Sequence, residues 1–247
     1  MVRVVVAGRL VAAVASVALL GGAVVGCGSG SGAGGGKAVA VSETPVRTSP
    51  IAGQLAGLPA TVDGAKIVVG KPDAPRTAQV LVDPKCGHCA RFEGAGGESL
   101  LKLAAAGQVK IEYLLASFLD RGGASGSVKA VNALRASVDA GKFAEFHAAV
   151  FASQPKGRFT DELLLRIADR VPGLRGAEFD AAVKDRKYEG WVAEAQEGFE
   201  ATGAQGTPMV LVEGAPVGSR DGSLFDAGAF GRALKGVGIG TGTGAAV

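Results

Sequence analysis

The two cysteines of the run Cys86-Gly87-His88-Cys89 have the clearest chemical potential in this 247-residue chain. Residues 78–82 are apolar enough for a buried strand, residues 83–85 break it, and the cysteine pair opens a segment with helical character. A cysteine at a helix N-terminus faces unpaired N–H groups and the positive end of the helix dipole, which favour the reactive thiolate. The spacing lets the second sulfur reach the first. The pair therefore predicts a redox site that holds or releases one disulfide.

Three other uses of the cysteine pair remain open on these residues. A zinc site normally needs four Cys or His ligands, and the chain offers Cys86, Cys89, His88 and His147 without a second CxxC pair. A copper chaperone would usually add a methionine or a suitably spaced histidine. A purely structural disulfide would close a tiny loop and constrain the unfolded chain little. Redox chemistry is the interpretation that we adopt, and it requires no metal and no cofactor.

The N-terminal residues 1–26 predict a secretory signal peptide. Arg3 and Arg9 make a basic start, and residues 10–25 form an uncharged run that is short for a membrane-spanning helix. The run ends in Val24-Val25-Gly26-Cys27, which resembles the lipobox of bacterial lipoproteins, where the cysteine is lipidated before cleavage. The alternatives are an ordinary signal peptide, or an uncleaved anchor, with Cys27 incidental.

Composition divides the rest of the chain into a tether, one domain and a tail. Residues 27–54 are rich in Gly, Ser, Pro and Thr and predict a flexible tether, and residues 238–247 a flexible tail. Residues 55–237 suit one domain. If Cys27 carries lipid, the CxxC cysteines are the two that remain free, which fits the oxidising exterior of the cell. Without residues 1–26 the chain has 24 basic and 23 acidic residues, so we expect no nucleic-acid binding.

The pattern along the domain predicts an α/β fold with an all-α insertion. Strands are expected at residues 66–69, 78–82, 109–115, 209–212 and 215–217. The helix after Cys86 should be weakened or kinked by Gly94, Gly96 and Gly97. Helices should dominate residues 125–202, one of them with Thr160 as its N-cap. A last helix is expected at residues 224–234.

Three separated motifs give the chain a family resemblance. Residues 70–75, the apolar strand, Asp83-Pro84-Lys85-Cys86-Gly87-His88-Cys89 and Phe92 resemble the active-site half of DsbA-like thiol–disulfide oxidoreductases. Residues 141–152 resemble that family's helical insertion, and Gly203-Ala204-Gln205-Gly206-Thr207-Pro208-Met209 resembles its cis-proline loop. The match keeps the family's order from about Val62 to Leu234. It implies a thioredoxin-like fold with an inserted all-α subdomain at about 125–203.

The resemblance also implies roles for the site residues. Cys86 would be the nucleophile and Cys89 the resolving thiol, with His88 favouring the Cys86 thiolate. Thr207 and Pro208, with the proline in its cis form, would flank the sulfurs and bind substrate. Lys85 either adds positive charge or is simply solvated.

Two departures from the family leave the direction of electron flow open. The dipeptide between the cysteines is Gly-His, as in the milder disulfide isomerases, where the strongest oxidants have Pro-His. Residues 78–82 also lack the buried acid that many thioredoxin-fold enzymes carry on this strand, so that role is vacant or belongs to Asp83, Lys85 or water. We interpret His147, together with Phe143, Phe146 and Trp191, as structural.

Three functions follow from these observations. The leading one is a dithiol oxidase or isomerase of exported proteins, lipid-anchored at the extracytoplasmic face of a bacterial membrane and served by an unidentified membrane redox partner. The second is a reductase of the same fold, for example in cytochrome maturation. The third is a lipid-anchored binding or chaperone-like protein with little redox turnover.

Overall fold

A computed structural model describes residues 44–241 of the protein. The expected signal peptide, Cys27, most of the tether and the last tail residues lie outside this part. Within it, a six-stranded sheet has the order β1-β2-β4-β3-β5-β6. The strands are β1 (Ala60–Asp63), β2 (Lys66–Val69), β3 (Thr77–Val82), β4 (Lys110–Leu115), β5 (Met209–Val212) and β6 (Ala215–Pro216).

The two central strands, β3 and β4, run parallel, so their carboxyl ends lie at the same edge of the sheet. β3 pairs in parallel with β4, while β2 and β5 pair antiparallel with β4 and β3 respectively. The cysteine motif follows the carboxyl end of β3, and Leu81 near that end pairs with Met209 at the start of β5. The cis-proline loop precedes Met209, so the sheet brings it beside the cysteines although more than a hundred residues separate them.

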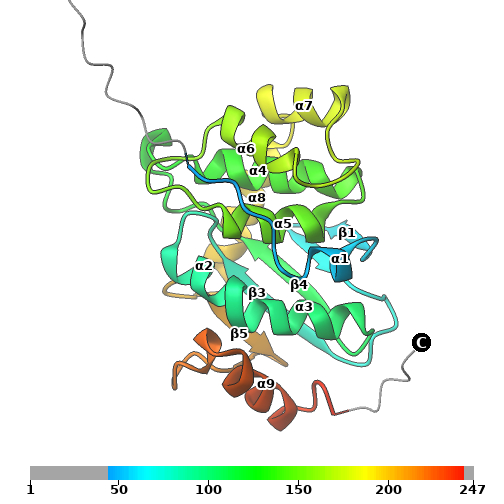
Figure 1. The fold of residues 1–247 in the computed structure, drawn as a ribbon. Helices are drawn as coiled ribbons and strands as arrows, with labels where there is room; N and C mark the ends of the chain where they lie inside the picture. The colour runs from blue at the N-terminus through cyan, green and yellow to red at the C-terminus, as the bar shows by residue number, and fades with distance from the viewer. Residues whose placement is uncertain (1–43, 242–247) are drawn as a thin grey trace, which may run out of the picture. The chain divides into compact units, whose positions relative to one another are not determined.

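Helices cover both faces of the sheet, unequally. Ala78, Val80 and Val82 alternate onto the face packed by α2 (Gly87–Phe92), α3 (Glu98–Ala105), α5 (Phe143–Ala152) and α9 (Ala227–Gly236). Leu81 and Leu114 point to the other face, where Phe199 of α8 (Glu189–Ala201) covers them. In Figure 1, α2 and α3 lie in front of the sheet and α8 behind it.

The helix that begins at the cysteines continues through Gly94, Gly96 and Gly97, but there it changes from an α-helix to a π-helix. Residues Glu93–Gly97 form a π-helical turn, η1, between α2 and α3. Gly96 lies so close to Leu224 and Phe230 that a Cβ would overlap them, and a Cβ on Gly97 would overlap the Glu93 carboxylate. The glycines expected to kink the helix are therefore required by close packing.

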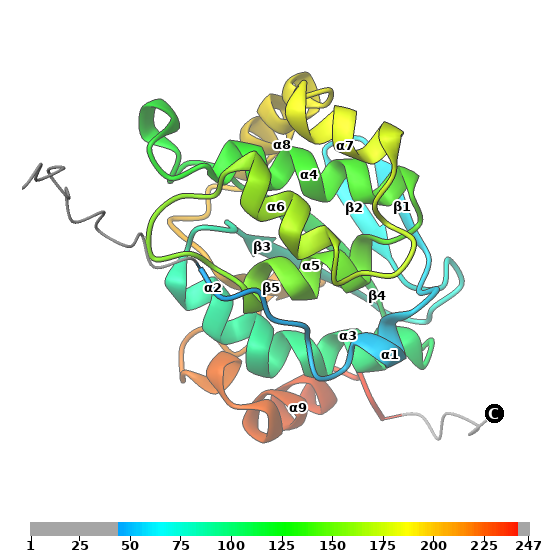
Figure 2. The ribbon, with the colours of Figure 1, turned by 45° about the horizontal axis from the view of Figure 1, so that its top comes forward.

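The helical insertion forms a layer at one end of the sheet, as Figure 2 shows. After the short η2 (Arg121–Gly123) it contains α4 (Ser127–Asp139), α5 (Phe143–Ala152), α6 (Asp161–Ala168), α7 (Ala177–Lys184) and α8 (Glu189–Ala201). Thr160 caps α6, because its side chain accepts a hydrogen bond from Leu163 N. This N-cap confirms the sequence-based prediction.

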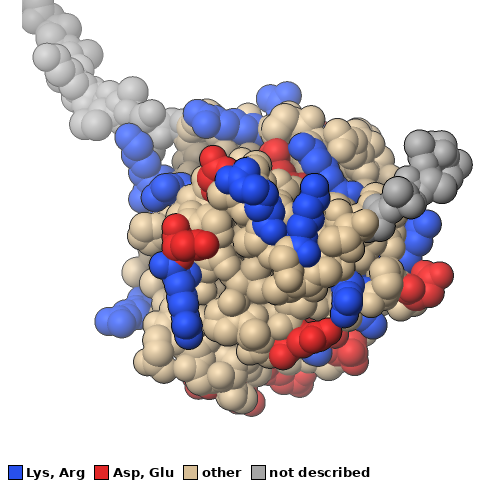
Figure 3. All heavy atoms as spheres, turned by 90° about the horizontal axis from the view of Figure 1, so that it is seen from below, with Lys and Arg blue, Asp and Glu red and all other residues tan. Residues whose placement is uncertain are grey.

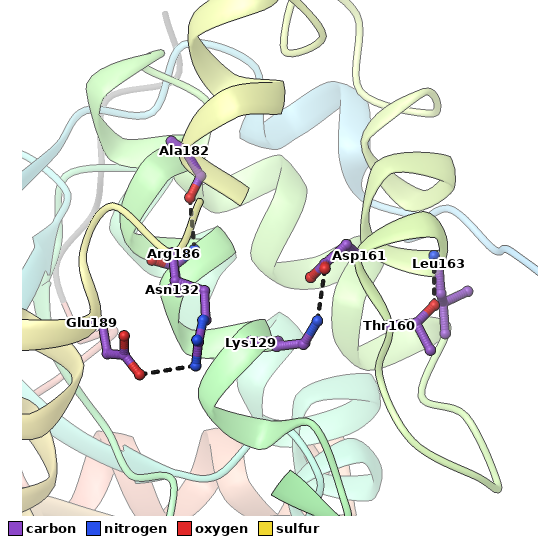
Figure 4. A network of polar contacts seen from close by, with 8 residues as sticks. All are labelled: Lys129, Asn132, Thr160, Asp161, Leu163, Ala182, Arg186 and Glu189. Carbon is purple, nitrogen blue, oxygen red and sulfur yellow. Dashed lines mark hydrogen bonds and ion pairs between the residues drawn. The ribbon is translucent and has the colours of Figure 1, made fainter. Parts of the chain in front are cut away.

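Polar contacts hold the helices of the insertion together (Figure 4). Lys129 of α4 pairs with Asp161 at 2.6 Å, and Arg186 pairs with Glu189 at 2.9 Å. The buried Asn132 amide donates to Ala182 O at 3.0 Å and accepts from Tyr188 N at 2.9 Å. A buried polar side chain needs such partners, and Asn132 thereby ties α4 to the end of α7.

The folded part extends beyond the boundaries expected at residues 55 and 237. Ile51 and Leu55 are buried, and α1 (Ala52–Leu55) packs on α3 and α5. At the other end Ile239 is buried, and its N–H donates to Leu234 O. The Gly- and Ser-rich composition that predicted a tether and a tail did not indicate that the apolar residues Ile51, Leu55 and Ile239 pack against the domain.

Charged side chains of both signs are spread over the face that carries α9 (Figure 3). They stand as separate groups on a mostly uncharged surface. The expectation that the protein does not bind nucleic acid stays a prediction. Of the helices within residues 44–241, none combines the length and apolar character needed to cross a membrane.

Candidate active site

Cys86 is the last residue of the loop between β3 and α2, residues 83–86, which we call the active-site loop. It is the N-cap residue of that helix, with extended backbone angles (φ −73°, ψ 117°), and its side chain is half-buried. Its N–H donates to Asp83 O at 3.0 Å and its carbonyl accepts from Ala90 N at 3.1 Å. Both cysteines of the pair are free thiols in this structure.

The surroundings of Cys86 stabilise its thiolate. The Cys89 thiol, donating to the Cys86 sulfur, contributes most to lowering the pKa of Cys86 to about 5; burial opposes this. The backbone N–H groups of Cys89 and His88 and the neighbouring Thr207 contribute further to the lower pKa. This is the thiolate stabilisation expected at a helix N-terminus, delivered by individual donors.

Cys89 has the opposite chemistry. It is fully buried one turn into α2. Burial, and then its hydrogen bond to Cys86, raise the pKa of the Cys89 thiol. At neutral pH the pair therefore holds one thiolate and one thiol, a combination that suits thiol–disulfide exchange. That Cys86 is the nucleophile and Cys89 the resolving thiol stays a prediction.

The cis-proline loop flanks Cys86. The Thr207–Pro208 peptide bond is cis, as the resemblance implied. The carbonyl oxygen of Thr207 lies 3.4 Å from Cys86 Sγ, where a thiol can donate to it. Both residues are half-buried, so an approaching chain can reach them.

The side chains of His88 and Lys85 have partners other than Cys86. The His88 imidazole is exposed and faces Phe225, with ring centroids 6.0 Å apart. Lys85 Nζ donates to Pro155 O at 2.8 Å. His88 contributes to the low pKa of Cys86 through its main-chain N–H, and the imidazole's influence on the thiolate stays a prediction.

Asp83 is the acidic side chain buried beside the motif. Its carboxylate accepts hydrogen bonds from Lys85 N at 2.8 Å, from Leu119 N at 3.1 Å and from the Ser127 hydroxyl. Burial raises the pKa of Asp83, and the nearby Cys86 charge adds to that rise against those hydrogen bonds. Of the candidates left open by the sequence, Asp83 is the one that the structure places in a buried position, just after β3.

A buried pair between α5 and η1 was not predicted from the sequence. His147 Nε2 lies 3.1 Å from Oε1 of Glu93, and both side chains are buried. The Tyr113 ring lies tilted against that of His147, with centroids 4.4 Å apart, and burial followed by the Glu93 charge raises the pKa of Tyr113. The sequence assigned His147 a structural role but could not reveal its partner, 54 residues away. Within residues 44–241 no group of three or more His, Cys, Asp or Glu side chains could hold a metal.

Comparison with known proteins accords with this geometry. The family model described as thioredoxin matches residues 62–224, which include both cysteines and the cis-proline. The chain belongs to the thioredoxin family. A curated hydroxyurea phosphotransferase from Kitasatospora aureofaciens is 66% identical over 32 residues, 13% of this chain and 9% of that protein. So short a match shows no shared activity.

Solved structures of the same fold include several thiol–disulfide oxidoreductases. MdbA from Actinomyces oris is 26% identical, with a TM-score of 0.60 over 73% of this chain and 89% of that one. MdbA from Corynebacterium matruchotii is 21% identical, with a TM-score of 0.58 over 65% and 86%. Reduced DsbA from Mycobacterium tuberculosis is 21% identical, with a TM-score of 0.54 over 70% and 99%.

These findings confirm the DsbA-like resemblance, the thioredoxin-like fold and the class of enzyme. The protein is a thiol–disulfide oxidoreductase of the DsbA-like kind.

Proposed function

We propose that this protein oxidises thiols to disulfides, or isomerises disulfides, in exported proteins outside the cytoplasmic membrane. The observation that carries the proposal is the pKa of Cys86, lowered to about 5. A stabilised thiolate stabilises the reduced enzyme, and this makes the disulfide form a stronger oxidant. The relatives MdbA and DsbA, which share the fold, support the same class of reaction.

In the oxidising direction, a substrate thiolate attacks Sγ of Cys86 in the Cys86–Cys89 disulfide. That bond breaks, a mixed disulfide forms, and Cys89 leaves and takes up a proton, as its raised pKa requires. A second substrate thiolate then attacks the substrate sulfur of the mixed disulfide. Cys86 leaves as a thiolate, and a low pKa makes it a good leaving group.

Thr207 and Pro208 are proposed to bind the substrate backbone. Proline has no N–H, and the cis bond exposes neighbouring backbone groups to which an extended segment can pair as an added strand. The Thr207 carbonyl already lies beside Cys86 Sγ. A substrate cysteine paired there would meet the reactive sulfur.

The enzyme reaction distinguishes the alternatives directly. Oxidised protein is mixed with reduced, unfolded ribonuclease, and disulfide transfer is followed by the gain of ribonuclease activity. We expect stoichiometric transfer that is lost in Cys86→Ser. Reduction of insulin disulfides without ribonuclease oxidation would favour the reductase, and activity in neither assay would favour the binding protein.

The lipid anchor belongs to the same proposal and rests on Val24-Val25-Gly26-Cys27 after an apolar run. Cys27→Ala should block lipidation and normal cleavage, as followed by a metabolic lipid label. Retention of the label in that variant would contradict the anchor, as would a mature N-terminus elsewhere in the wild type. The membrane redox partner would be found as a mixed disulfide trapped by Cys89→Ser.

A further inference from the structure

The loop that follows α5 contacts the active-site loop through the side chain of Gln154. Nε2 of Gln154 lies 2.7 Å from Pro84 O and 3.0 Å from Cys86 O. Both partners are carbonyl acceptors, so the NH₂ end of the amide must face them. One side chain of the insertion thus binds the main chain at two residues of the active-site loop.

The residues on either side of Gln154 are themselves fixed. Ser153 is buried, and its hydroxyl accepts from Arg47 N at 2.8 Å and donates to Arg47 O at 3.1 Å. The carbonyl of Pro155 accepts from Lys85 Nζ at 2.8 Å. Because both neighbours are anchored, the Gln154 amide is held in place for its two acceptors.

The two hydrogen bonds from Gln154 fix the main chain that determines where the Cys86 sulfur lies. The Cys86 carbonyl oxygen accepts the first hydrogen bond of α2, from Ala90 N. The second lone pair of the same oxygen accepts the hydrogen bond from Gln154. Pro84 is buried and has no N–H of its own. With the carbonyls of Pro84 and Cys86 both held, the backbone cannot rotate freely about Cys86.

The position of Sγ matters because Cys86 is the N-cap of α2 and its Sγ lies 3.4 Å from the carbonyl oxygen of Thr207. Hydrogen bonds weaken steeply as their angles depart from linearity. A small rotation at Cys86 would therefore weaken the contact with Thr207 and move Sγ away from the N-terminus of α2, whose positive end favours the thiolate.

We infer that Gln154 is a positioning residue, which holds the Cys86 backbone so that Sγ stays at the N-terminus of α2 beside the Thr207 carbonyl. Its hydrogen bonds go to carbonyl oxygens, and it takes no part in the exchange itself. The helical insertion thereby contributes to the reactivity of the cysteine pair, although Cys86, Cys89 and Thr207 all lie outside it.

The test is a titration of the reduced, purified full-length protein with no substrate present. Gln154→Leu removes the amide, and Gln154→Asn keeps an amide one methylene too short to reach. Thiolate absorbance should show the Cys86 pKa rising by about one unit in both, a tenfold loss of thiolate stability. The reduction potential should fall by about 30 mV, the equivalent of tenfold. Gln54→Leu, an exposed glutamine on α1, is the matched control and should change neither.

A merely structural role would give a different result. The melting temperature of the Gln154 variants would fall while the Cys86 pKa and the potential stayed at the wild-type values, and this outcome would overturn the inference. If Gln154→Leu does not fold, Gln154→Asn decides by the same readouts. The titration needs no substrate or partner, so its result is independent of the proposed location and direction.

Discussion

Cys86 Sγ lies 3.4 Å from the carbonyl oxygen of Thr207, a residue 121 positions later in the chain. The antiparallel pairing of β3 with β5 creates this contact, because the cysteines follow one strand and the cis-proline loop precedes the other. A thiol can donate to the carbonyl, whereas a thiolate cannot. Protonation of Cys86 therefore changes the contact at the place where a substrate would bind.

The pKa of Cys86 predicts when the site becomes reactive. Because this pKa is about 5, the thiolate forms as the pH rises through that value and persists at neutral pH. Iodoacetamide labelling of the reduced protein should rise to half its maximum near pH 5, and mass spectrometry should find the label on Cys86. Preferential labelling of Cys89 would reverse the roles of the two cysteines.

The largest contribution to this low pKa comes from the thiol of Cys89. Cys89→Ala removes the donor and should raise the Cys86 pKa by one unit or more, about tenfold in thiolate stability. Cys89→Ser keeps a hydroxyl donor and should retain most of the lowering. Equal pKa values in the two variants would show that the backbone N–H groups suffice.

The sequence revealed the parts of this site whose signals are local. The strand at residues 66–69, the Thr160 cap and the CxxC-headed helix each follow from neighbouring residues, and the structure has them as β2, α6 and α2. β1 was missed because Ala60–Asp63 is a four-residue edge strand with no buried residue. The bonds of Gln154 to the Cys86 loop join residues about seventy positions apart. No local pattern predicts such a pair.

His88 offers two separable contributions. Its main-chain N–H contributes to the low pKa of Cys86, while its imidazole is exposed near Phe225. His88→Ala keeps the N–H, so we expect a small decrease in the reduction potential, less than about 30 mV. Titration against glutathione measures it. A decrease beyond about 60 mV would assign the main contribution to the imidazole.

The buried Glu93–His147 pair should matter for stability. Glu93→Gln removes the carboxyl group that lies 3.1 Å from Nε2 of His147 between α5 and η1. Removal of one member of a buried pair costs about 3–5 kcal/mol in the free energy of unfolding. Urea denaturation measures this cost, and exposed Glu194→Gln on α8 is the control.

A double-mutant cycle with His147→Gln tests whether the two residues act together. We expect the double variant to lose less than the sum of the single losses, because each single variant already breaks the same contact. A loss below about 0.5 kcal/mol in Glu93→Gln, the level of an ordinary surface change, would refute the role of the pair.

The reduction potential of the Cys86–Cys89 couple tests the proposed direction most directly. The pKa of Cys86 is about 5, against about 7 for the corresponding cysteine of thioredoxin. At pH 7 this difference favours the reduced form over the disulfide form by about fiftyfold more than in thioredoxin. This contribution alone raises the reduction potential by about 50 mV. Glutathione titration should therefore give a value nearer the isomerase range of about −180 mV than the thioredoxin value of about −270 mV. A potential at or below that of thioredoxin would contradict the oxidase or isomerase and identify a reductase.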